Sequence, residues 1–451
     1  MPSPLAAALP EILAFTPEAF AHLGAHLKPE WFFEALAALA DGEEGQAQMR
    51  RRKLPVDRAL WLSIGMGLFR DRSIQEVVQH LDLALARPGP RSGVAKSAIV
   101  QARQRLGAEP VQHLFELTAQ AWGHASAQQD RWRGLSLYGL DGVCLRVADT
   151  PQNEEAFGRP GSGREGSGYP QVRMVGLMAL RSHVLAGLSV GGINQSEHAL
   201  VTPLWERIPD HSLSILDRNF LSWGPLYRLH QGGKERHWLL RTKSNLKWKT
   251  LQRLGPGDER VEIKTPKRLR EEFPDMPETI QARVVKYQVK GYRPQRLITS
   301  LLDAERFPAS ELAGLYHERW EIELGYDELK THMLEREEAL RSKQPEGVRQ
   351  EIAGIAIAYN LVRKEMERVA RELNLPPTRI SFRHALMLIR NFCLAAWAAS
   401  PGVLPSRLGE LDSELRLLVL PERRPERRYK RHVKIKMSNF PRNRGRSAPP
   451  A

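Results

Sequence analysis

Two aspartates lie in strand-like segments where a lone carboxylate is costly. Asp141 shares its parity with Leu137 and Val143, so its side chain falls on the apolar face of an alternating strand. Asp217 ends a second apolar run, over residues 213–217. A buried, unpaired carboxylate is unfavourable unless a cation or hydrogen bonds compensate. A salt bridge or a helix cap explains one such acid, whereas two in one α/β unit favour a shared divalent metal ion.

A third carboxylate belongs to a helix that the sequence predicts over residues 310–334. Tyr316, Arg319, Glu323 and Lys330 stand at offsets of 0, 3, 7 and 14 along it. At about 100° per residue, these four side chains fall within roughly 60° of arc and line about 20 Å of helix. Pairing between Arg319 and Glu323 explains two of them. It leaves Tyr316 and Lys330 on the same stripe without an explanation.

The elements that would position these residues follow a mixed α/β order. Alternating apolar residues predict strands over 135–147, 172–180, 184–193, 213–217 and 237–242, with helices near 199–208 and 225–230. A basic stretch over 243–296 then interrupts this order. It contains strand-like segments at 260–263 and 280–289, which indicates a β-rich insertion. Helices resume at residue 308 and continue to about residue 397.

The first 125 residues read as short helices. Ser73 and Glu76 form a capping box, and another helix begins near residue 97. That helix carries the polar residues Gln101, Arg103, Gln104 and Arg105. The arrangement is typical of a helix-turn-helix unit that reads base edges, and equally of a helical bundle with solvated polar faces. Both interpretations stay open.

Positive charge is unevenly distributed along the 451 residues, whose net charge is +15. The last 31 residues hold 11 Lys and Arg against 2 acids, and residues 241–296 hold 15 against 7. Clustered positive charge suits a polyanion such as nucleic acid. Two cysteines, Cys144 and Cys393, exclude a disulfide framework and a cysteine-rich zinc site. With no apolar run near 20 residues and no basic leader, we expect a cytoplasmic protein without membrane contact.

Three motifs resemble those of bacterial insertion-sequence transposases. Tyr-x2-Arg-x3-Glu-x6-Lys over residues 316–330 is similar to the YREK signature of the insertion sequence 4 type. The Asp-Gly-Val-Cys-Leu-Arg run that begins at Asp141 resembles the first Asp motif of that family. The Leu-Asp-Arg-Asn-Phe run around Asp217 resembles the second. The order of the motifs, with a basic β insertion before the last, also matches.

The resemblance implies a ribonuclease H-like catalytic core with an Asp-Asp-Glu triad of Asp141, Asp217 and Glu323. In such a site two Mg²⁺ ions, which Mn²⁺ can replace, activate an attacking oxygen and stabilise the leaving 3′ oxygen in phosphodiester displacement. It also implies that Tyr316, Arg319 and Lys330 contact phosphates of the transposon end. The family uses an aromatic residue of the insertion to hold a flipped base. The candidates here are Trp248, Tyr287 and Tyr292.

These inferences give a provisional organisation and function. We expect a helical DNA-binding domain over 1–125 and a catalytic domain over 130–345 with its insertion at about 243–300. A helical region over 346–400 and a basic, flexible tail over 401–451 would follow. The expected function is cut-and-paste transposition by a bacterial, nucleoid-associated homodimer acting on terminal inverted repeats and target DNA. A non-catalytic DNA-binding descendant and a nuclease without strand transfer are the alternatives.

Overall fold

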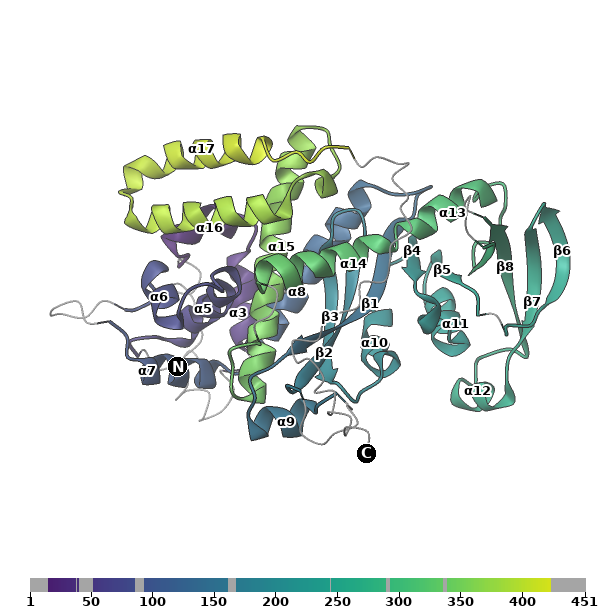
Figure 1. The fold of residues 1–451 in the computed structure, drawn as a ribbon, viewed down its shortest axis with the longest axis horizontal. Coiled ribbons are helices and arrows are strands. Elements are labelled where there is room, and N and C mark those ends of the chain that lie inside the picture. The colour runs from purple at the N-terminus through teal and green to yellow at the C-terminus, as the bar shows by residue number, and fades with distance from the viewer. Residues whose placement is uncertain are drawn as a thin grey trace, which may run out of the picture.

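The computed structural model describes residues 15–37, 39, 52–85, 93–160, 168–243, 245–288, 293–335 and 339–422. The fold is mixed α/β, as predicted, with a single nine-stranded sheet of order β3-β2-β1-β4-β5-β9-β8-β7-β6 (Figure 1). Strands β1, β4 and β5 run parallel, and the other neighbouring pairs run antiparallel. The bounds are β1 Ser136–Arg146, β2 Gln171–Ala179, β3 Val184–Gly192, β4 Ser212–Leu216, β5 Arg236–Arg241, β6 Lys249–Gly255, β7 Asp258–Lys264, β8 Thr279–Tyr287 and β9 Gln295–Thr299.

The basic stretch after β5 extends the same sheet. Strands β6, β7 and β8 join it through β9, and α12 (Lys267–Glu272) lies between β7 and β8. Inside this half, Arg283 is fully buried and donates two hydrogen bonds to the Asp258 carboxylate, at 2.7 and 2.6 Å. The insertion is therefore β-rich, and it continues the sheet to its far edge (Figure 1).

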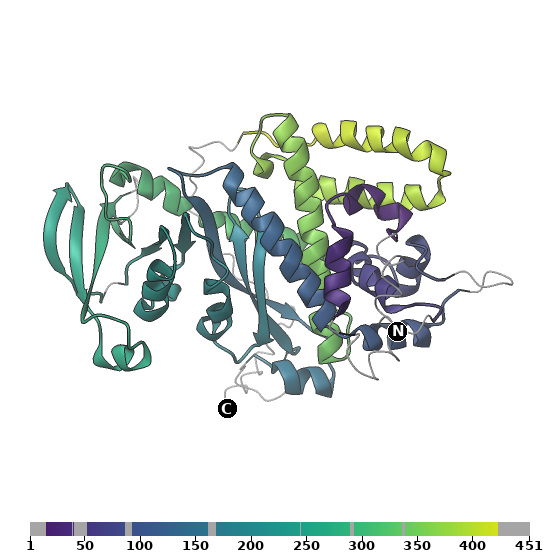
Figure 2. The same cartoon turned by 180° about the vertical axis from the view of Figure 1, so that it is seen from behind.

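Helices cover both faces of the first half of the sheet. One face packs on α14 (Trp320–Asp327), and the opposite face packs on α8 (Glu109–Gln129), α10 (Glu197–Trp205) and α11 (Trp223–Gln231). Helix α15 (Pro345–Glu372) lies along the β3 edge, where the Asn360 side chain hydrogen-bonds the Leu185 amide and carbonyl. Figures 1 and 2 show α15 between the sheet and most of the helices from the two ends of the chain. Those helices are α2 Ala21–Gly24, α3 Pro29–Ala37, α5 Val56–Leu68, α6 Ile74–His80, α7 Lys96–Leu106, α16 Phe382–Ala398 and α17 Leu404–Arg416. The two other helices are α9 Pro151–Phe157, which contacts β2, and α13 Ala309–His317, which contacts β8.

The N-terminal helices share one apolar core with the sheet. Helix α5 crosses α15 so closely that a Cβ on Gly354 would lie 2.2 Å from the Ser63 carbonyl oxygen. Glycine is needed at this crossing because any side chain would push the helices apart. In α7, Arg103 donates to Gln350, Ser342 and Gly347. That side chain therefore holds α7 against α15, as the helical-bundle interpretation requires.

The predicted continuous helix over 310–334 is wrong. Helix α13 ends at His317, α14 starts at Trp320, and a π-helical segment follows over Glu328–Met333. Glu318 at the break is held by Arg181, with an Arg181 Nη2 to Glu318 Oε1 distance of 2.8 Å. The break interrupts the regular 100° spacing between Tyr316 and Trp320, and the π-helical segment ends it after Asp327.

The expected flexible tail from residue 401 is also wrong in part, because residues 404–416 form α17. Leu404, Leu408, Leu411 and Leu415 recur at helical spacing and pack on the core. The rest of the basic tail, from residue 423, lies outside the described residues. Among the described helices, none is long and apolar enough to cross a membrane.

Candidate active site

Asp141 and Asp217 follow equivalent positions on two neighbouring parallel strands. Leu140 of β1 pairs with Leu216 of β4 at the end of their shared register, and each aspartate comes directly after its leucine. Neighbouring strands lie about 4.8 Å apart. The two aspartates therefore stand side by side where β4 ends.

The Asp141 carboxylate is partly buried and weakly solvated. Its Oδ1 accepts a hydrogen bond from the Gly142 amide at 2.8 Å. Burial raises the pKa of Asp141 from 3.8 to about 6. The hydrogen bond from the Gly142 amide and the charge of Arg319 lower this pKa, whereas the charges of Glu197 and Glu323 raise it further. The ionised carboxylate at this position is therefore short of positive partners.

Helix α14 lies directly over β1. A Cβ on Gly139 would stand 3.5 Å from the Cβ of Ile322, the residue before Glu323. Glycine at this position lets the helix approach the strand two residues before Asp141. The close approach brings Glu323 within electrostatic range of Asp141.

Tyr326 fixes the same helix to two strands. Its hydroxyl donates to the Asp141 carbonyl oxygen at 2.7 Å and accepts a hydrogen bond from the Gly176 amide at 2.8 Å. Burial raises the pKa of Tyr326 well above its usual value, and the Asp141 charge adds to this. The phenol therefore stays neutral and acts as an anchor. The sequence carries no signal for it beyond its position three residues after Glu323.

Arg319 lies among the three predicted carboxylates. Its Nη2 is 2.8 Å from Glu323 Oε1. Burial lowers the pKa of Arg319, but the Glu323 hydrogen bond and charge, with smaller contributions from Tyr316 and Asp217, outweigh burial and raise it. The Arg319 charge also lowers the pKa of Asp141. The Arg319 guanidinium therefore interacts electrostatically with all three acids.

In this DNA-free structure, the three predicted carboxylates are not arranged as a metal-binding site. Within the described ranges, no three His, Cys, Asp or Glu side chains are close enough together to hold an ion. Glu323 is occupied by Arg319. The donor set nevertheless fits a hard divalent cation, because it offers only carboxylate oxygens and includes the partly desolvated Asp141.

The other two signature residues have different surroundings. Tyr316 is buried, and burial raises its pKa, with Arg319 opposing and Asp217 adding to the rise. Tyr316 therefore stands near Asp217, on the same side of the molecule as the acids. Lys330 is exposed in the π-helical segment, and no described acid pairs with it. Arg319 contacts Glu323 and acts on Tyr316, so these three side chains lie near one another despite the break, whereas the π-helical segment removes the regular spacing on which the inclusion of Lys330 depends.

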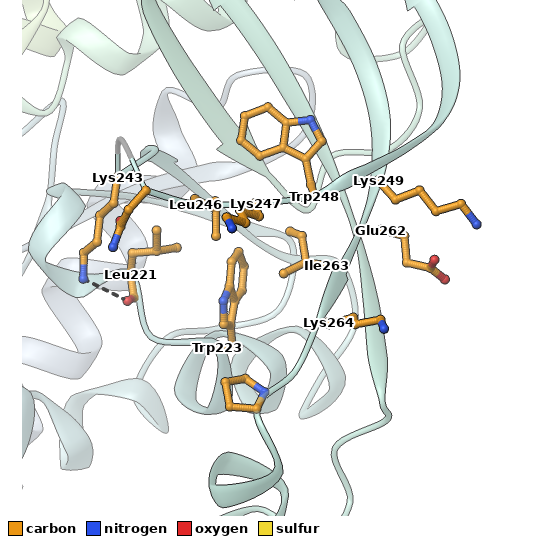
Figure 3. A pocket seen from close by; sticks show the side chains of 12 residues that line it. Leu221, Trp223, Lys243, Leu246, Lys247, Trp248, Lys249, Glu262, Ile263 and Lys264 are labelled. Carbon is orange, nitrogen blue, oxygen red and sulfur yellow. Dashed lines mark hydrogen bonds between the residues drawn. The ribbon is translucent and has the colours of Figure 1, made fainter.

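The aromatic candidates occupy separate places. Trp248 lines a cavity of about 630 Å³ together with Trp223 and the lysines at 243, 247, 249 and 264. Figure 3 shows the two indole rings across the cavity from each other. Tyr287 packs edge-on against His317, with ring centroids 6.3 Å apart. Tyr292 lies outside the described residues.

Comparison with known proteins identifies relatives along most of the chain. The family described as "Insertion element 4 transposase N-terminal" matches residues 17–116, and "Transposase DDE domain" matches residues 132–361. Transposase InsG for insertion sequence element IS4 of Escherichia coli is 38% identical over 420 residues, which are 93% of each chain. Putative transposase InsZ of Escherichia coli is 36% identical over 222 residues, covering 49% of this chain and 71% of its own.

One solved structure matches along most of the length of the chain. The piggyBac transposase synaptic complex with hairpin DNA has a TM-score of 0.42 and 12% identity, covering 93% of this chain and 86% of that one.

The DDE domain match spans the strands that carry Asp141 and Asp217 and the helix that carries Glu323. From this match, and from 38% identity over nearly the whole of a relative, the chain belongs to the insertion element 4 family of DDE-type DNA transposases.

Proposed function

We propose that Asp141, Asp217 and Glu323 hold the divalent ions with which this transposase cuts and joins DNA. The observation that carries the proposal is the register of β1 and β4, which sets the two aspartates side by side. The strands β3-β2-β1-β4-β5, with β1, β4 and β5 parallel, would form the ribonuclease H-like core. Transposases with this domain generally use divalent ions, and the all-oxygen donor set favours Mg²⁺, with Mn²⁺ as a substitute.

The bound ions would supply Lewis-acid stabilisation of the attacking and leaving oxygens. The chain's own contribution begins with Arg319. In the DNA-free protein this guanidinium neutralises Glu323 and lies within range of Asp141 and Asp217. When DNA arrives, Arg319 would exchange Glu323 for a phosphate, which a guanidinium binds well through paired hydrogen bonds. That exchange releases Glu323 to complete the donor set.

The surrounding residues would bind and orient the DNA end. Tyr316 would donate its hydroxyl hydrogen to a phosphate oxygen beside Asp217, because burial keeps the phenol protonated. Lys330 would contact the backbone as an exposed point charge. We favour Trp248 over Tyr287 for the flipped base. Trp248 faces an open cavity, and the Arg296 guanidinium carbon lies 5.4 Å from the centroid of its ring.

The larger assembly follows from the reaction. Cut-and-paste transposition brings two ends together, so we propose a homodimer on paired terminal inverted repeats, with target DNA captured later. The reaction would take place at the nucleoid in the bacterial cytoplasm. The N-terminal helices would contribute to end recognition, with Gln101 and Gln104 of α7 exposed and available.

The test is cleavage and joining of inverted-repeat DNA by full-length protein in Mg²⁺. Asp141→Asn, Asp217→Asn and Glu323→Gln should each lower cleavage by at least about 100-fold while gel-shift affinity for the ends persists. Asp149→Asn is the matched control, because Asp149 is exposed and pairs with Arg159. If any of the three variants cleaves at the wild-type rate, the residue replaced in it is not a metal ligand of the active site. Cleavage without joining of pre-cut ends would instead identify a nuclease.

A further inference from the structure

The turn between β2 and β3 binds the helix that carries Glu323. Two side chains of this turn, Arg181 and His183, reach acids at the start of that helix. The Arg181 Nε atom lies 2.9 Å from Oε2 of Glu318, just before α14. The His183 Nε2 atom lies 2.9 Å from Oε2 of Glu321, in the first turn of α14. One short turn therefore contacts the start of α14 through two carboxylates.

The His183 ring is fixed from both sides. Its side chain is only 2% exposed. Because an ionised carboxylate only accepts hydrogen bonds, Nε2 carries a hydrogen and donates it to Glu321. On the other side of the ring, Nδ1 contacts the Arg363 guanidinium and lies 3.3 Å from Glu328 Oε2. The ring therefore connects α15 and the π-helical segment to α14.

Helix α14 depends on such contacts for its orientation. It has eight residues and lies between the break after α13 and the π-helical segment, so no long helix fixes its rotation. Tyr326 anchors its last turn to β1 and β2. Glu321 lies in its first turn, about 200° around the helix axis from Glu323. The hydrogen bond from His183 therefore fixes the first turn and, with it, the direction in which Glu323 points.

The ordinary role of a His–Glu pair in a turn is structural, and His211 gives an example. Its backbone is left-handed like that of His183, with φ of 53° against 60°, and its Nδ1 lies 2.7 Å from Glu235 Oε2. The His211 side chain is half exposed and precedes β4, at the opposite end of that strand from Asp217. His183 differs in its burial and in its partner, which belongs to α14.

We propose that His183 is a positioning residue for DNA cleavage and joining: by donating to Glu321, it keeps α14 in the orientation in which Glu323 faces the two aspartates. The proposal rests on the proposed function, because it requires Glu323 to bind the divalent ion. The contact matters most when Arg319 leaves Glu323 for a DNA phosphate. The position of Glu323 then depends on how α14 is held by the rest of the protein.

The test is cleavage of inverted-repeat DNA by full-length variants over a range of Mg²⁺ concentrations. In His183→Asn the shorter amide reaches the position of Nδ1 but not that of Nε2, so the hydrogen bond to Glu321 is lost. We expect cleavage at least about tenfold slower and a higher Mg²⁺ concentration for the half-maximal rate, with gel-shift affinity for the ends kept. His183→Gln should restore most of the rate, because its amide reaches Glu321. Glu321→Ala removes the same hydrogen bond from the partly exposed side and should match His183→Asn.

Amide hydrogen exchange of the metal-free protein measures the helix itself. In His183→Asn the amides of α14 should exchange faster, while those of β1 and β4 keep their wild-type protection. His211→Asn is the matched control and should behave as the wild type does in both assays. Thermal unfolding of each variant checks that the fold is kept.

The outcomes separate this inference from the proposed function. Slow cleavage with a raised Mg²⁺ requirement in His183→Asn and Glu321→Ala, restored in His183→Gln, supports both. With Glu323→Gln inactive, wild-type cleavage by His183→Asn overturns the inference alone. Equal loss in His183→Asn and His183→Gln at an unchanged Mg²⁺ requirement does so too, because it indicates a packing role. Wild-type cleavage by Glu323→Gln contradicts both the proposed function and the inference.

Discussion

At the residue scale, the site depends on a balance of charge around Arg319. Three acids surround a single guanidinium that touches one of them directly. In the proposed site, this ion pair would keep Glu323 from the metal until DNA binds. The sequence predicts the acids and Arg319, because their types and spacing carry the family signature. It does not predict Tyr326, whose hydrogen-bond partners, the Asp141 carbonyl oxygen and the Gly176 amide, are backbone groups distant in sequence.

Replacing Arg319 should separate its two roles. We expect Arg319→Gln to raise the Mn²⁺ affinity of DNA-free protein about tenfold, because a competing cation is removed from Glu323. The same change should lower end cleavage, because glutamine cannot form the paired, charged hydrogen bonds to a phosphate. Calorimetry and a cleavage assay measure the two effects. A fall in both would show that Arg319 supports metal binding and does not compete with it.

The raised pKa of Asp141 predicts a pH-dependent stability. A carboxyl group whose folded pKa of about 6 exceeds its usual 3.8 takes up protons on folding, so stability falls as pH rises between these values. In EDTA, Asp141→Asn should therefore stabilise the protein at pH 7.5, by on the order of 2 kcal/mol, and have little effect at pH 4. Urea unfolding at both pH values measures this. An equal effect at both would contradict the raised pKa.

At the element scale, the parallel strands and α14 set the geometry. The sequence predicts β1, β4 and β5 well, because their alternating apolar residues pack against helices on both faces. It misses β6, which is an almost fully exposed edge strand with no apolar face to reveal it. It also misses the break before α14 and the π-helical segment after it. Both depend on ion pairs to Arg181 and Arg363, which are remote in sequence.

The π-helical segment is held by a buried charge pair. Glu328 accepts hydrogen bonds from Arg363 and from the Tyr359 hydroxyl, the latter at 3.0 Å. Burial alone would raise the pKa of Glu328, but the charges of Arg363 and His183 outweigh burial and hold it at about 2. Losing Arg363 would leave the buried Glu328 carboxylate without its guanidinium partner.

We therefore expect Arg363→Met to destabilise the protein by about 3–5 kcal/mol. Adding Glu328→Gln should restore most of the stability, because the uncompensated charge disappears. Denaturant unfolding of both single variants and the double variant measures the coupling. Additive destabilisation in the double variant would show that the two side chains act independently.

At the scale of the whole molecule, the sheet connects two parts of different character. Strands β1–β5 are covered by helices, whereas the basic insertion adds β6–β9 at the other end of the sheet. The composition predicts the basic insertion as a DNA-facing region, but it does not reveal that β6–β8 continue the catalytic sheet through β9. The sequence of the N-terminal helices leaves two interpretations open. In the structure Arg103 and Arg105 make intramolecular hydrogen bonds, so polar residues alone are no reliable sign of a DNA-reading helix.

The lysines of the basic insertion should set salt-dependent affinity. Lys247→Ala with Lys249→Ala should weaken end binding and reduce the slope of log affinity against log salt by about one for each phosphate that the protein no longer neutralises. Lys234→Ala, an exposed lysine outside the insertion, serves as the control. Binding titrations at several salt concentrations measure the slope. An unchanged slope in the double variant would show that Lys247 and Lys249 do not contact the DNA phosphates.

The convergence of Asp141, Asp217 and Glu323 on a metal ion is tested most directly by iron-directed cleavage of the chain. Fe²⁺ replaces Mg²⁺ at oxygen-ligand sites and, with ascorbate and peroxide, cuts nearby backbone. In full-length protein bound to end DNA, we expect cuts close to residues 141, 217 and 323, suppressed by excess Mg²⁺. Mg²⁺-sensitive cuts confined to other segments would show that the metal binds elsewhere and would contradict the assignment.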